Sequence, residues 1–520
     1  MKIKDLIKGL DILQMKNYKE DINIEGISFH SQRVKENFLY VAIKGYLVDG
    51  HTFINDAIDK GARVILVEDF VKTRQDICQI KLINTRVALS KVSSNFYSNP
   101  SSKIKTIGIT ATNGKTTTSF LLDEIYKLAG YKTGLIGSVI SKIKDEVKLS
   151  LLTTPESLEL QELFYKMTEE KLDRALMEVS SSALELYRVN DIDFDIVSFN
   201  NFTREHIDQH GTYENYWQVK SSLIKNAKED SLAILNLDNE RIRTLTNQTK
   251  ARVVDFSINT DLGRIVCTNL KLVNGRARFT VKIKEDIPLK DFTIKKTSFD
   301  VDLKIPGYHS VENAMCAIVI ALADKIPLDV IKQGLRDFGG VERRFEFIYE
   351  RDYTIIDDHF ANIKNINSTL ETLTDMDKNK VIIIYAIRGN RGVTVNRENA
   401  EALLAWKDKL GINSIIATKS IGAVGDKDRV SKDEEEVFKE VLDKSDLSYT
   451  IYDSLEDAVS MGLSQAEPHD LVLLAGCQGM DHGGRVALNY LYLKDPSLDK
   501  NDLFKPLLKR LSESDLKGEE

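Results

Sequence analysis

The sequence predicts an α/β protein of three domains, the central one built on a mostly parallel sheet. Its 520 residues exceed what one hydrophobic core usually serves. Short apolar runs alternate with helix-compatible segments along most of the chain, as a parallel sheet requires. At residues 106–118, an apolar run ends in a Gly-Lys-Thr turn that opens a helix-like segment. Together these observations predict the α/β class.

The first domain is expected to cover residues 1–103 as a small α/β unit. Helical stretches and a glycine-containing turn near Gly45 separate its strand-like runs, which lie at residues 38–43 and 62–67. The segment Asn99-Pro-Ser-Ser-Lys103 groups turn-forming residues before the Gly-Lys-Thr region. We therefore interpret this segment as a linker.

Two further domains follow, a central one at residues 104–340 and a Rossmann-like α/β domain at residues 341–495. The strands of the central domain are expected at residues 106–109, 175–179 and 232–236. Those of the third are expected at residues 353–357, 381–385, 414–418 and 471–475. The ends of these last strands would present Asp357, Arg388 and Gly476 toward a ligand crevice. Residues 496–520 form a charge-rich tail that we expect to fray.

Composition excludes several classes of protein. The chain carries 72 basic and 79 acidic residues, a net charge of −7, which argues against an extended nucleic-acid surface. No apolar run approaches the roughly 18 residues of a membrane helix, and the first residues lack a signal-peptide core. The four cysteines are far apart and form no Cys-x-x-Cys pair, so neither disulfides nor a zinc knuckle is predicted. We expect a cytoplasmic protein without stable membrane insertion.

The Gly-Lys-Thr turn predicts a nucleotide site. Free N–H groups at a helix N-terminus bind anionic oxygens, Lys115 can reach terminal phosphates, and the Thr116 hydroxyl can ligate Mg²⁺. ATP is the expected cofactor. Gly108 lies one residue further from Gly114 than the usual phosphate-loop spacing allows, and a chance Gly-Lys-Thr in a surface turn is the alternative. The residues expected to contact the nucleotide here are Thr112, Asn113, Gly114, Lys115, Thr116 and Thr117.

Several further segments follow the phosphate loop in an order that resembles the Mur ligase family. They are Thr153-Thr-Pro-Glu156, Glu178-Val-Ser-Ser181, residues 201–211 and Lys220, and in the first domain residues 26–32 and 49–62. Similarity is greatest to the MurE group, the UDP-N-acetylmuramoyl-tripeptide synthetases. The resemblance implies a UDP-binding first domain. It also implies a reaction in which ATP phosphorylates a substrate carboxylate and an amine then attacks the acyl phosphate.

The resemblance implies four metal ligands, of which Glu178, His206 and Lys220 also serve catalysis together with Lys115. Thr116 and Glu178 match the positions that hold Mg²⁺ on the ATP phosphates, and His206 matches a second Mg²⁺ position. Lys220 matches a lysine that is carbamylated to hold the second metal. Taken alone, Lys220 is typical of a solvated helix residue, and His206 with His210 has the spacing of a helical zinc pair. No third zinc ligand of the expected pattern accompanies that pair.

The resemblance also assigns substrate contacts. The UDP-linked peptide would be bound by residues matching family positions, which are Ser31, Thr153, Thr154, Ser180 and Arg188. The adenosine part of ATP would contact Asn313, Arg344 and Asp358. Taken alone, the two threonines before Pro155 are as typical of a turn. This chain departs from the family at His30 and Gln32, which flank Ser31, and at Ser182, where MurE enzymes commonly have histidine.

The third domain, which should select a free amino acid, has drifted furthest. The Asp-Asn-Pro-x signature that helps MurE enzymes to distinguish diaminopimelate from lysine is replaced by Ala417-Thr-Lys-Ser-Ile-Gly. Arg388, Arg391 and Arg397 form a basic cluster in which one residue could bind the incoming carboxylate, with a solvated loop as the alternative. The drift leaves open an archaeal pseudomurein peptide ligase, a P-loop NTPase switch, or a non-enzymatic nucleotide-binding scaffold.

Overall fold

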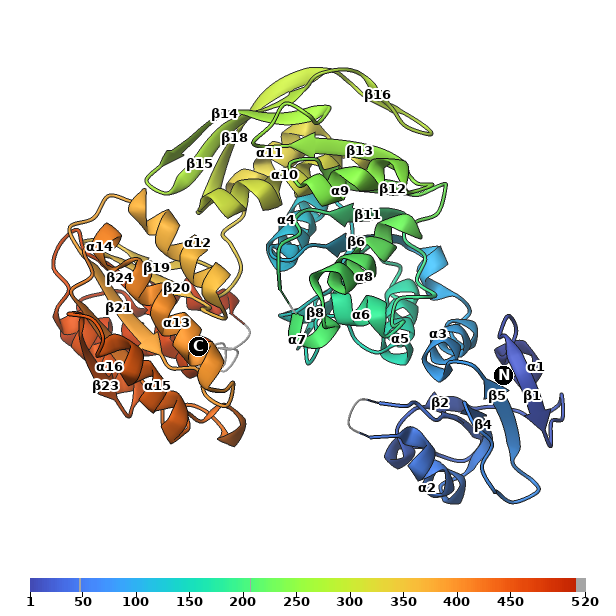
Figure 1. Cartoon of the computed structure of the whole chain (residues 1–520). Coiled ribbons are helices and arrows are strands. Elements are labelled where there is room, and N and C mark those ends of the chain that lie inside the picture. Colours follow the sequence, from blue (N-terminus) through green and yellow to red (C-terminus); the bar gives the residue numbers. More distant parts are fainter. Residues whose placement is uncertain (46–47, 206, 511–520) are drawn as a thin grey trace. The chain divides into compact units, whose positions relative to one another are not determined.

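The computed structural model describes residues 1–45, 48–205 and 207–510. It divides into two compact units, which are described separately. The first comprises Met1–Cys267, Lys282–Ser298 and Asn313–Gly334. The second comprises Thr268–Val281, Phe299–Glu312 and the chain from Leu335 onward. Figure 1 shows the helices and strands of both.

The first unit begins with a five-stranded sheet in the order β1-β5-β4-β3-β2, in which only β1 runs antiparallel to its neighbour. Strand β4 is apolar along most of its length because it is covered on both faces. Val64 and Leu66 pack into one core and Ile65 and Val67 into another, as the two-residue period of a strand requires. The strands are β1 (Ile12–Lys16), β2 (Gly26–Ser28), β3 (Phe38–Val41), β4 (Ala62–Val67) and β5 (Cys78–Leu82). The helices are α1 (Ile3–Leu6), α2 (Ile54–Asp59) and α3 (Thr85–Phe96).

The second sheet has the order β18-β15-β14-β13-β12-β11-β6-β10-β7-β8-β9. The run from β14 to β7 is parallel, whereas β8 and β9 are antiparallel. Its parallel strands are β6 (Lys105–Thr110), β7 (Thr133–Ile136), β10 (Arg174–Glu178), β11 (Ile196–Phe199), β12 (Leu232–Asn236), β13 (Arg252–Ser257) and β14 (Ile265–Val273). The other strands are β8 (Ile140–Ile143), β9 (Glu146–Leu149), β15 (Arg276–Ile283), β18 (Thr297–Pro306) and the separate pair β16 (Ile287–Pro288) and β17 (Thr293–Ile294).

Helices follow the parallel strands of this sheet, and several have capping side chains that explain where they start. Thr212 caps α8 by accepting a hydrogen bond from the N–H of Asn215, and Ser180 caps α6 through the N–H of Ala183. These helices are α4 (Lys115–Leu128), α5 (Ser157–Glu169), α6 (Ser181–Glu185), α7 (Ile207–His210), α8 (Tyr213–Lys225), α9 (Glu240–Thr244), α10 (Tyr308–Ala323) and α11 (Leu328–Asp337).

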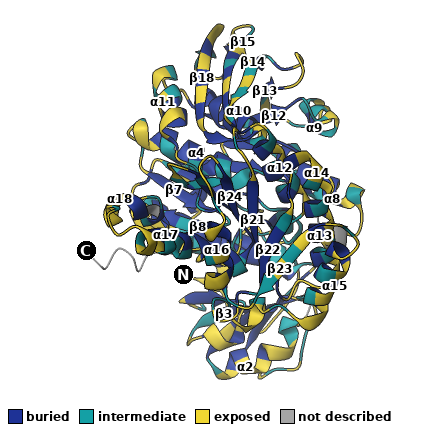
Figure 2. Cartoon of the chain, turned by 90° about the vertical axis from the view of Figure 1, so that its left-hand side faces the viewer, coloured by how far each residue is buried: buried dark blue, intermediate teal, exposed yellow. Residues whose placement is uncertain are grey.

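The third sheet lies in the second unit and has the order β19-β20-β24-β21-β22-β23, parallel except for β19. Its central strands are buried on both faces (Figure 2). In β21, Ile383 and Tyr385 face one core and Ile382 and Ile384 the other. Such double coverage is typical of a Rossmann-like layer order. The strands are β19 (Glu346–Glu350), β20 (Thr354–Asp358), β21 (Val381–Ala386), β22 (Ser414–Thr418), β23 (Ser448–Tyr452) and β24 (Leu471–Ala475).

Two layers of helices cover this sheet. Helices α12 (Ile363–Thr374), α13 (Val393–Ala405), α14 (Lys407–Leu410) and α15 (Lys432–Leu442) contribute to the core on one face. Helices α16 (Leu455–Ser464), α17 (Gly483–Lys494) and α18 (Lys500–Phe504) contribute to the core on the other. The prediction of an α/β fold with parallel-rich sheets is therefore confirmed. Among the residues that the structure describes, no helix is both long and apolar enough to span a bilayer.

The expectation that the chain frays from residue 496 is wrong for the described part of the tail. Helix α18 and the 3₁₀ turn Leu507–Lys509 bury Leu503, Phe504 and Leu507 in the core that α16 and α17 share. These apolar side chains order the segment despite its many charges, because their burial removes apolar surface from water. Residues 511–520 lie outside the described residues.

Candidate active site

The phosphate loop connects the carboxyl end of β6 to α4 and is held by Asn201, which follows β11. The N–H of Thr112 donates to the Asn201 main-chain carbonyl at 2.9 Å, and the N–H of Asn113 donates to Asn201 Oδ1 at 3.0 Å. Asn201 Nδ2 returns a hydrogen bond to the Asn113 carbonyl at 3.0 Å. The first N–H groups of α4 have no partner within the helix and remain the anion-binding end of the loop.

Gly114 is required at the start of α4 for two reasons. Its φ of +86° lies in the left-handed region that side chains disfavour. A Cβ atom at this position would lie 1.9 Å from Oδ1 of Asn313, which α10 places against the loop. Asn200 donates from Nδ2 to the same Oδ1 at 3.4 Å. Asn313, which we expect to contact the adenosine part of ATP, thus lies against the phosphate loop within the first unit.

Glu178 ends β10 with a fully buried carboxylate beside the loop. Thr116 Oγ1 donates to its Oε2 at 3.0 Å, while Ser138 donates from N to Oε1 at 3.0 Å and from Oγ to Oε2 at 2.9 Å. Burial raises the pKa of Glu178, and the positive charge of Lys115 opposes that rise. Gly137 lets the carboxylate approach, because a Cβ there would lie 2.2 Å from Oε1. Sequence reasoning missed Ser138.

Lys115 and Lys220 converge on one main-chain carbonyl. Lys115 Nζ donates to Ala111 O at 3.0 Å and Thr112 O at 3.1 Å, and Lys220 Nζ donates to Ala111 O at 2.8 Å. Lys220 is 1% exposed, on α8. Burial lowers the pKa of both amines, and for Lys220 the nearby charge of Lys115 lowers the pKa further. His206, predicted to join this group, lies outside the described residues.

Four of the five residues expected to bind the UDP-linked peptide meet at the end of β10. Thr154 Oγ1 donates to the Glu178 main-chain carbonyl at 2.8 Å and to Ser180 Oγ at 3.2 Å. Arg188 donates to the Thr154 carbonyl at 3.0 Å, and its Nε is a buried donor without a partner. Thr153 Oγ1 lies 3.0 Å from Ser138 Oγ. Within the described ranges, no hydrogen bond or ion pair joins these four to Ser31, which is buried in the first domain.

At Ser182, where the chain departs from the family, the serine hydroxyl is hydrogen-bonded to the side chain of Gln209. Gln209 Nε2 donates to Ser182 Oγ at 2.7 Å and to Glu185 at 3.2 Å. His210 Nε2 lies 2.9 Å from Ser181 Oγ. These contacts tie α7, which directly follows residue 206, to α6. Sequence reasoning missed Gln209 because its partner is 27 residues away.

In the second unit, Asp358 is buried at the end of β20. It accepts hydrogen bonds from the N–H of Phe345 at 2.9 Å and from Thr369 Oγ1. Burial raises the pKa of this carboxyl group. Arg344, which is half-buried, directly precedes Phe345 in the sequence. The structure therefore connects the ends of β19 and β20, where these two predicted nucleotide contacts lie.

The prediction that Asp357 faces a ligand crevice is wrong. Its carboxylate is fully buried, with Arg343 Nε at 3.1 Å and Arg510 NH2 at 2.8 Å. A buried carboxylate requires such cationic partners, and here both partners belong to the protein, so the side chain does not face a ligand. Gly476 lies close by, since its carbonyl accepts a hydrogen bond from Arg343 NH2 at 2.6 Å.

The basic loop at residues 388–392 is fixed by Glu434 of α15. The Glu434 carboxylate accepts from three successive main-chain N–H groups, those of Asn390 at 3.0 Å, Arg391 at 2.7 Å and Gly392 at 2.7 Å. These hydrogen bonds lower the pKa of Glu434 against the effect of burial. Because a carboxylate of the protein already occupies these donors, they are not open to a substrate anion.

The three arginines of the predicted basic cluster, two in this loop and Arg397 on α13, differ in their partners. Arg388 donates to the Ala361 carbonyl and keeps a buried Nε without a partner. Arg391 pairs with Asp428 at 2.9 Å. Arg397 is exposed and pairs with Glu440 at 2.9 Å. Of the three, Arg388 is the one with a buried N–H donor that could still bind a substrate group.

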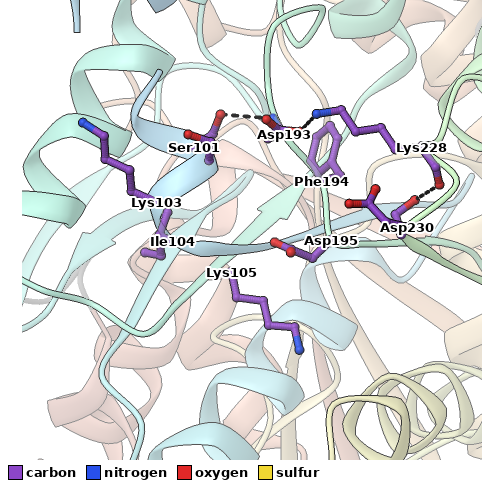
Figure 3. Close-up of a pocket in the computed structure, with 11 residues that line it drawn as sticks. Ser101, Lys103, Ile104, Lys105, Asp193, Phe194, Asp195, Lys228 and Asp230 are labelled. Atoms are coloured by element: carbon purple, nitrogen blue, oxygen red, sulfur yellow. Dashed lines mark hydrogen bonds and ion pairs between the residues drawn. The ribbon is translucent and has the colours of Figure 1, made fainter. Parts of the chain in front are cut away.

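A pocket of about 540 Å³ opens at the opposite, amino end of β6, β11 and β12 (Figure 3). Two of its lysines are paired within the protein, Lys228 with Asp193 and Lys105 with Asp324. Asp195 accepts a hydrogen bond from the N–H of Thr106 at 2.7 Å. None of the predicted site residues lines this pocket.

Three family profiles match the chain in order along its length. "Mur ligase family, catalytic domain" matches residues 23–109, "Mur ligase middle domain" residues 109–321, and "Mur ligase, glutamate ligase domain" residues 343–478. The chain belongs to the Mur ligase family. It is therefore an ATP-dependent ligase that forms an amide bond. The resemblance drawn from the motifs is confirmed.

Curated and solved relatives agree with this assignment. The UDP-N-acetylmuramoyl-L-alanyl-D-glutamate–2,6-diaminopimelate ligase of Clostridium tetani is 31% identical over 519 residues, covering 98% of this chain and 100% of the relative. A solved structure of an enzyme with that name is 20% identical, with a TM-score of 0.65 over 92% of this chain and 93% of the other. A pseudomurein peptide ligase type C from Methanothermus fervidus is 16% identical, with a TM-score of 0.53 over 86% of this chain and 93% of the other.

Proposed function

We propose that this ligase adds a free amino acid to a UDP-linked muramoyl peptide, as the MurE group does. The observation that carries the proposal is the group of Lys115, Thr116, Glu178 and Lys220 around the phosphate loop, in which Glu178 and Lys220 are buried. Lys115 and Lys220, both with lowered pKa values, donate hydrogen bonds to the loop that we expect to bind phosphates. A scaffold or a simple nucleotide switch has no need of the second lysine.

Mg²⁺ fits the donors that the loop provides. Glu178 is a buried carboxylate within 3.0 Å of the Thr116 hydroxyl, and hard oxygen donors of this kind suit Mg²⁺. Thr116 and Glu178 would hold one ion, and by resemblance His206 and a carbamylated Lys220 would hold a second. Bound Mg²⁺ neutralises phosphate oxygens so that an anionic nucleophile can approach them.

The protein's own groups then have separate tasks. The N-terminus of α4 binds the phosphate oxygens of ATP, and Lys115 turns from the Ala111 and Thr112 carbonyls toward them. The substrate carboxylate attacks the outermost phosphorus, ADP leaves, and the amine of the incoming amino acid displaces phosphate from the acyl phosphate. Thr153, Thr154, Ser180 and Arg188 bind the UDP-linked substrate beside Glu178, where hydroxyl and guanidinium groups meet.

The muramoyl acceptor is favoured over the pseudomurein type because the curated relatives that cover nearly the whole chain are MurE enzymes. Those relatives are named for 2,6-diaminopimelate, which makes it the first amino acid to test. In this chain, however, the stretch that corresponds to the family's Asp-Asn-Pro-x signature contains Ser420, whose hydroxyl donates to the Gly479 carbonyl at 2.6 Å. The identity of the incoming amino acid is therefore to be determined by the assay described next.

Phosphate release tests the proposal over a panel of UDP-linked peptides crossed with free amino acids. We expect near-idle ATP turnover until both substrates are present, and tight dependence on one acceptor. GTP hydrolysis without either substrate would favour a nucleotide switch instead. A second measurement places ¹⁸O in the acceptor carboxylate, and one labelled oxygen should appear in the released phosphate. Unlabelled phosphate would overturn the acyl-phosphate route.

A further inference from the structure

The last described residue of the chain, Arg510, enters the interior of the second unit. It is 1% exposed although it follows a charge-rich segment. That segment is held in the core by Leu503, Phe504 and Leu507, and this fixes the position of the Arg510 backbone. Gly484 makes room for it, because a Cβ at Gly484 would lie 2.8 Å from Arg510 NH1. A long charged side chain is buried in this way only when the protein supplies counter-charges.

The counter-charges are two carboxylates that face each other across a pair of strands. Glu346 of β19 lies directly opposite Asp357 of β20 in the antiparallel register. Arg510 NH2 lies 2.7 Å from Glu346 Oε2 and 2.8 Å from Asp357 Oδ2. Like charges directly opposite each other destabilise a sheet, and the guanidinium of Arg510 offsets that repulsion by binding both.

A second arginine shares this network. Arg343 donates from Nε to Asp357 Oδ1 at 3.1 Å and pairs with Asp481, while its main-chain N–H donates to Glu346 Oε2 at 2.8 Å. The network thus contains the carboxylates of Glu346, Asp357 and Asp481 with the guanidinium groups of Arg343 and Arg510. Without Arg510, the buried carboxylate of Asp357 and the largely buried one of Glu346 would share Arg343 with the half-exposed Asp481.

The network lies immediately beside two residues expected to contact ATP. Asp358 follows Asp357 on β20, and Arg344 follows Arg343 before β19. The hydrogen bond from the Phe345 N–H to Asp358 Oδ1 joins the same two segments. Separation of the two paired strands at Glu346 and Asp357 would therefore shift both Arg344 and Asp358.

We propose that Arg510 is a positioning residue for nucleotide binding, because it binds Glu346 and Asp357 together and so fixes the backbone that carries Arg344 and Asp358. The inference rests on the proposed function, which assigns those two residues to ATP. It gives the C-terminal segment a role in the nucleotide site without direct contact with the nucleotide.

The test compares Arg510→Met with the charge-balanced variant Arg510→Met/Glu346→Gln, which removes one cation and one anion together. Lys505→Met, an exposed lysine on the same segment, and deletion of residues 511–520 are the controls. Calorimetry measures binding of a non-hydrolysable ATP analogue with Mg²⁺, and phosphate release gives KM for ATP and for the UDP-linked peptide. Circular dichroism and thermal unfolding report the fold.

Arg510→Met should weaken analogue binding and raise KM for ATP by about tenfold, with KM for the UDP-linked peptide within about twofold of wild type. The balanced variant should recover affinity to within about threefold, and both controls should match wild type. If Arg510→Met does not fold, Arg510→Lys keeps the charge without the two-pronged contact and should bind the analogue several-fold more weakly.

Folded Arg510→Met or Arg510→Lys with wild-type analogue affinity would overturn this inference and leave the proposed function intact. Equal loss of affinity for ATP and for the UDP-linked peptide would also overturn it, because that pattern indicates a general loss of structure. Wild-type protein that binds no analogue would instead overturn the proposed function, and the inference with it.

Discussion

The phosphate-loop region of the first unit and the basic loop of the second use their charges in opposite ways. Around the phosphate loop, the amines of Lys115 and Lys220 donate to main-chain carbonyls, and burial lowers the pKa of both. In the loop at residues 388–392, Glu434 accepts three main-chain N–H groups and Arg391 pairs with Asp428. The first arrangement leaves charge to be matched by a substrate, whereas the second uses charge to hold a loop in place. Mutations should therefore stop turnover in the first region and change substrate affinity in the second.

The largest effect is expected for Lys115→Ala. The variant removes the cation that would bind the ATP phosphates, so ATP-dependent amide formation should fall by at least about 10³-fold. The fold should be retained, because the lost hydrogen bonds end on carbonyls of the loop itself. Phosphate release and circular dichroism measure the two properties. Lys144→Ala, at an exposed lysine of the same unit, is the control. Normal turnover of Lys115→Ala would remove the assignment of the phosphate loop.

Lys220→Ala should have the next largest effect, a loss of about 10²-fold in turnover. If the carbamate of Lys220 is the functional group, a short-chain carboxylate such as acetate should restore part of the activity by taking its place in the cavity. Thermal unfolding is measured in parallel, because the loss of this buried side chain leaves a cavity. Activity is measured with and without added carboxylate. Wild-type turnover without any rescue would discard this role.

How far sequence could predict these regions depends on the separation of the interacting residues. Lys115 and Thr116 were predictable because a phosphate loop is a local feature that forms where a strand meets a helix. Ser138 and Gln209 were not, because they meet Glu178 and Ser182 only after the fold brings together segments 27 or more residues apart. A hydroxyl or an amide in such places carries no signal of its own in a single sequence.

The second unit shows the same limit for charged residues. Asp357 has the place of a ligand-facing side chain at a strand end, yet Arg343 and Arg510 neutralise it inside the protein. Arg510 is 153 positions further along the chain, within a segment whose composition predicts fraying. Alternation of apolar residues fixes which faces of the strands are buried, but it does not reveal which charges pair across them.

Glu434→Gln should sharpen the comparison by changing affinity rather than turnover. Glutamine keeps the size of the side chain but offers one carbonyl oxygen and an NH₂ group in place of the carboxylate that binds three N–H groups. The loop should loosen and KM for the amino acid should rise by about tenfold, with kcat less affected. Steady-state rates at varied amino acid and at varied ATP separate the two effects. An equal rise in KM for ATP would contradict a role confined to this loop.

Arg397→Ala should have the smallest effect on KM for the amino acid. Comparing it with Arg388→Ala shows which arginine of the basic cluster binds the substrate. Arg397 is exposed and its partner Glu440 lies on the surface, where an ion pair contributes little to stability. The pKa of Glu440 is lowered to about 2 by hydrogen bonds from Arg397 and Lys444, and Lys444 remains in the variant. KM for the amino acid should therefore change by less than about twofold, whereas Arg388→Ala, which removes a buried guanidinium, should raise it much further. A larger effect at Arg397 than at Arg388 would show that the exposed end of the cluster, and not its buried end, receives the incoming carboxylate.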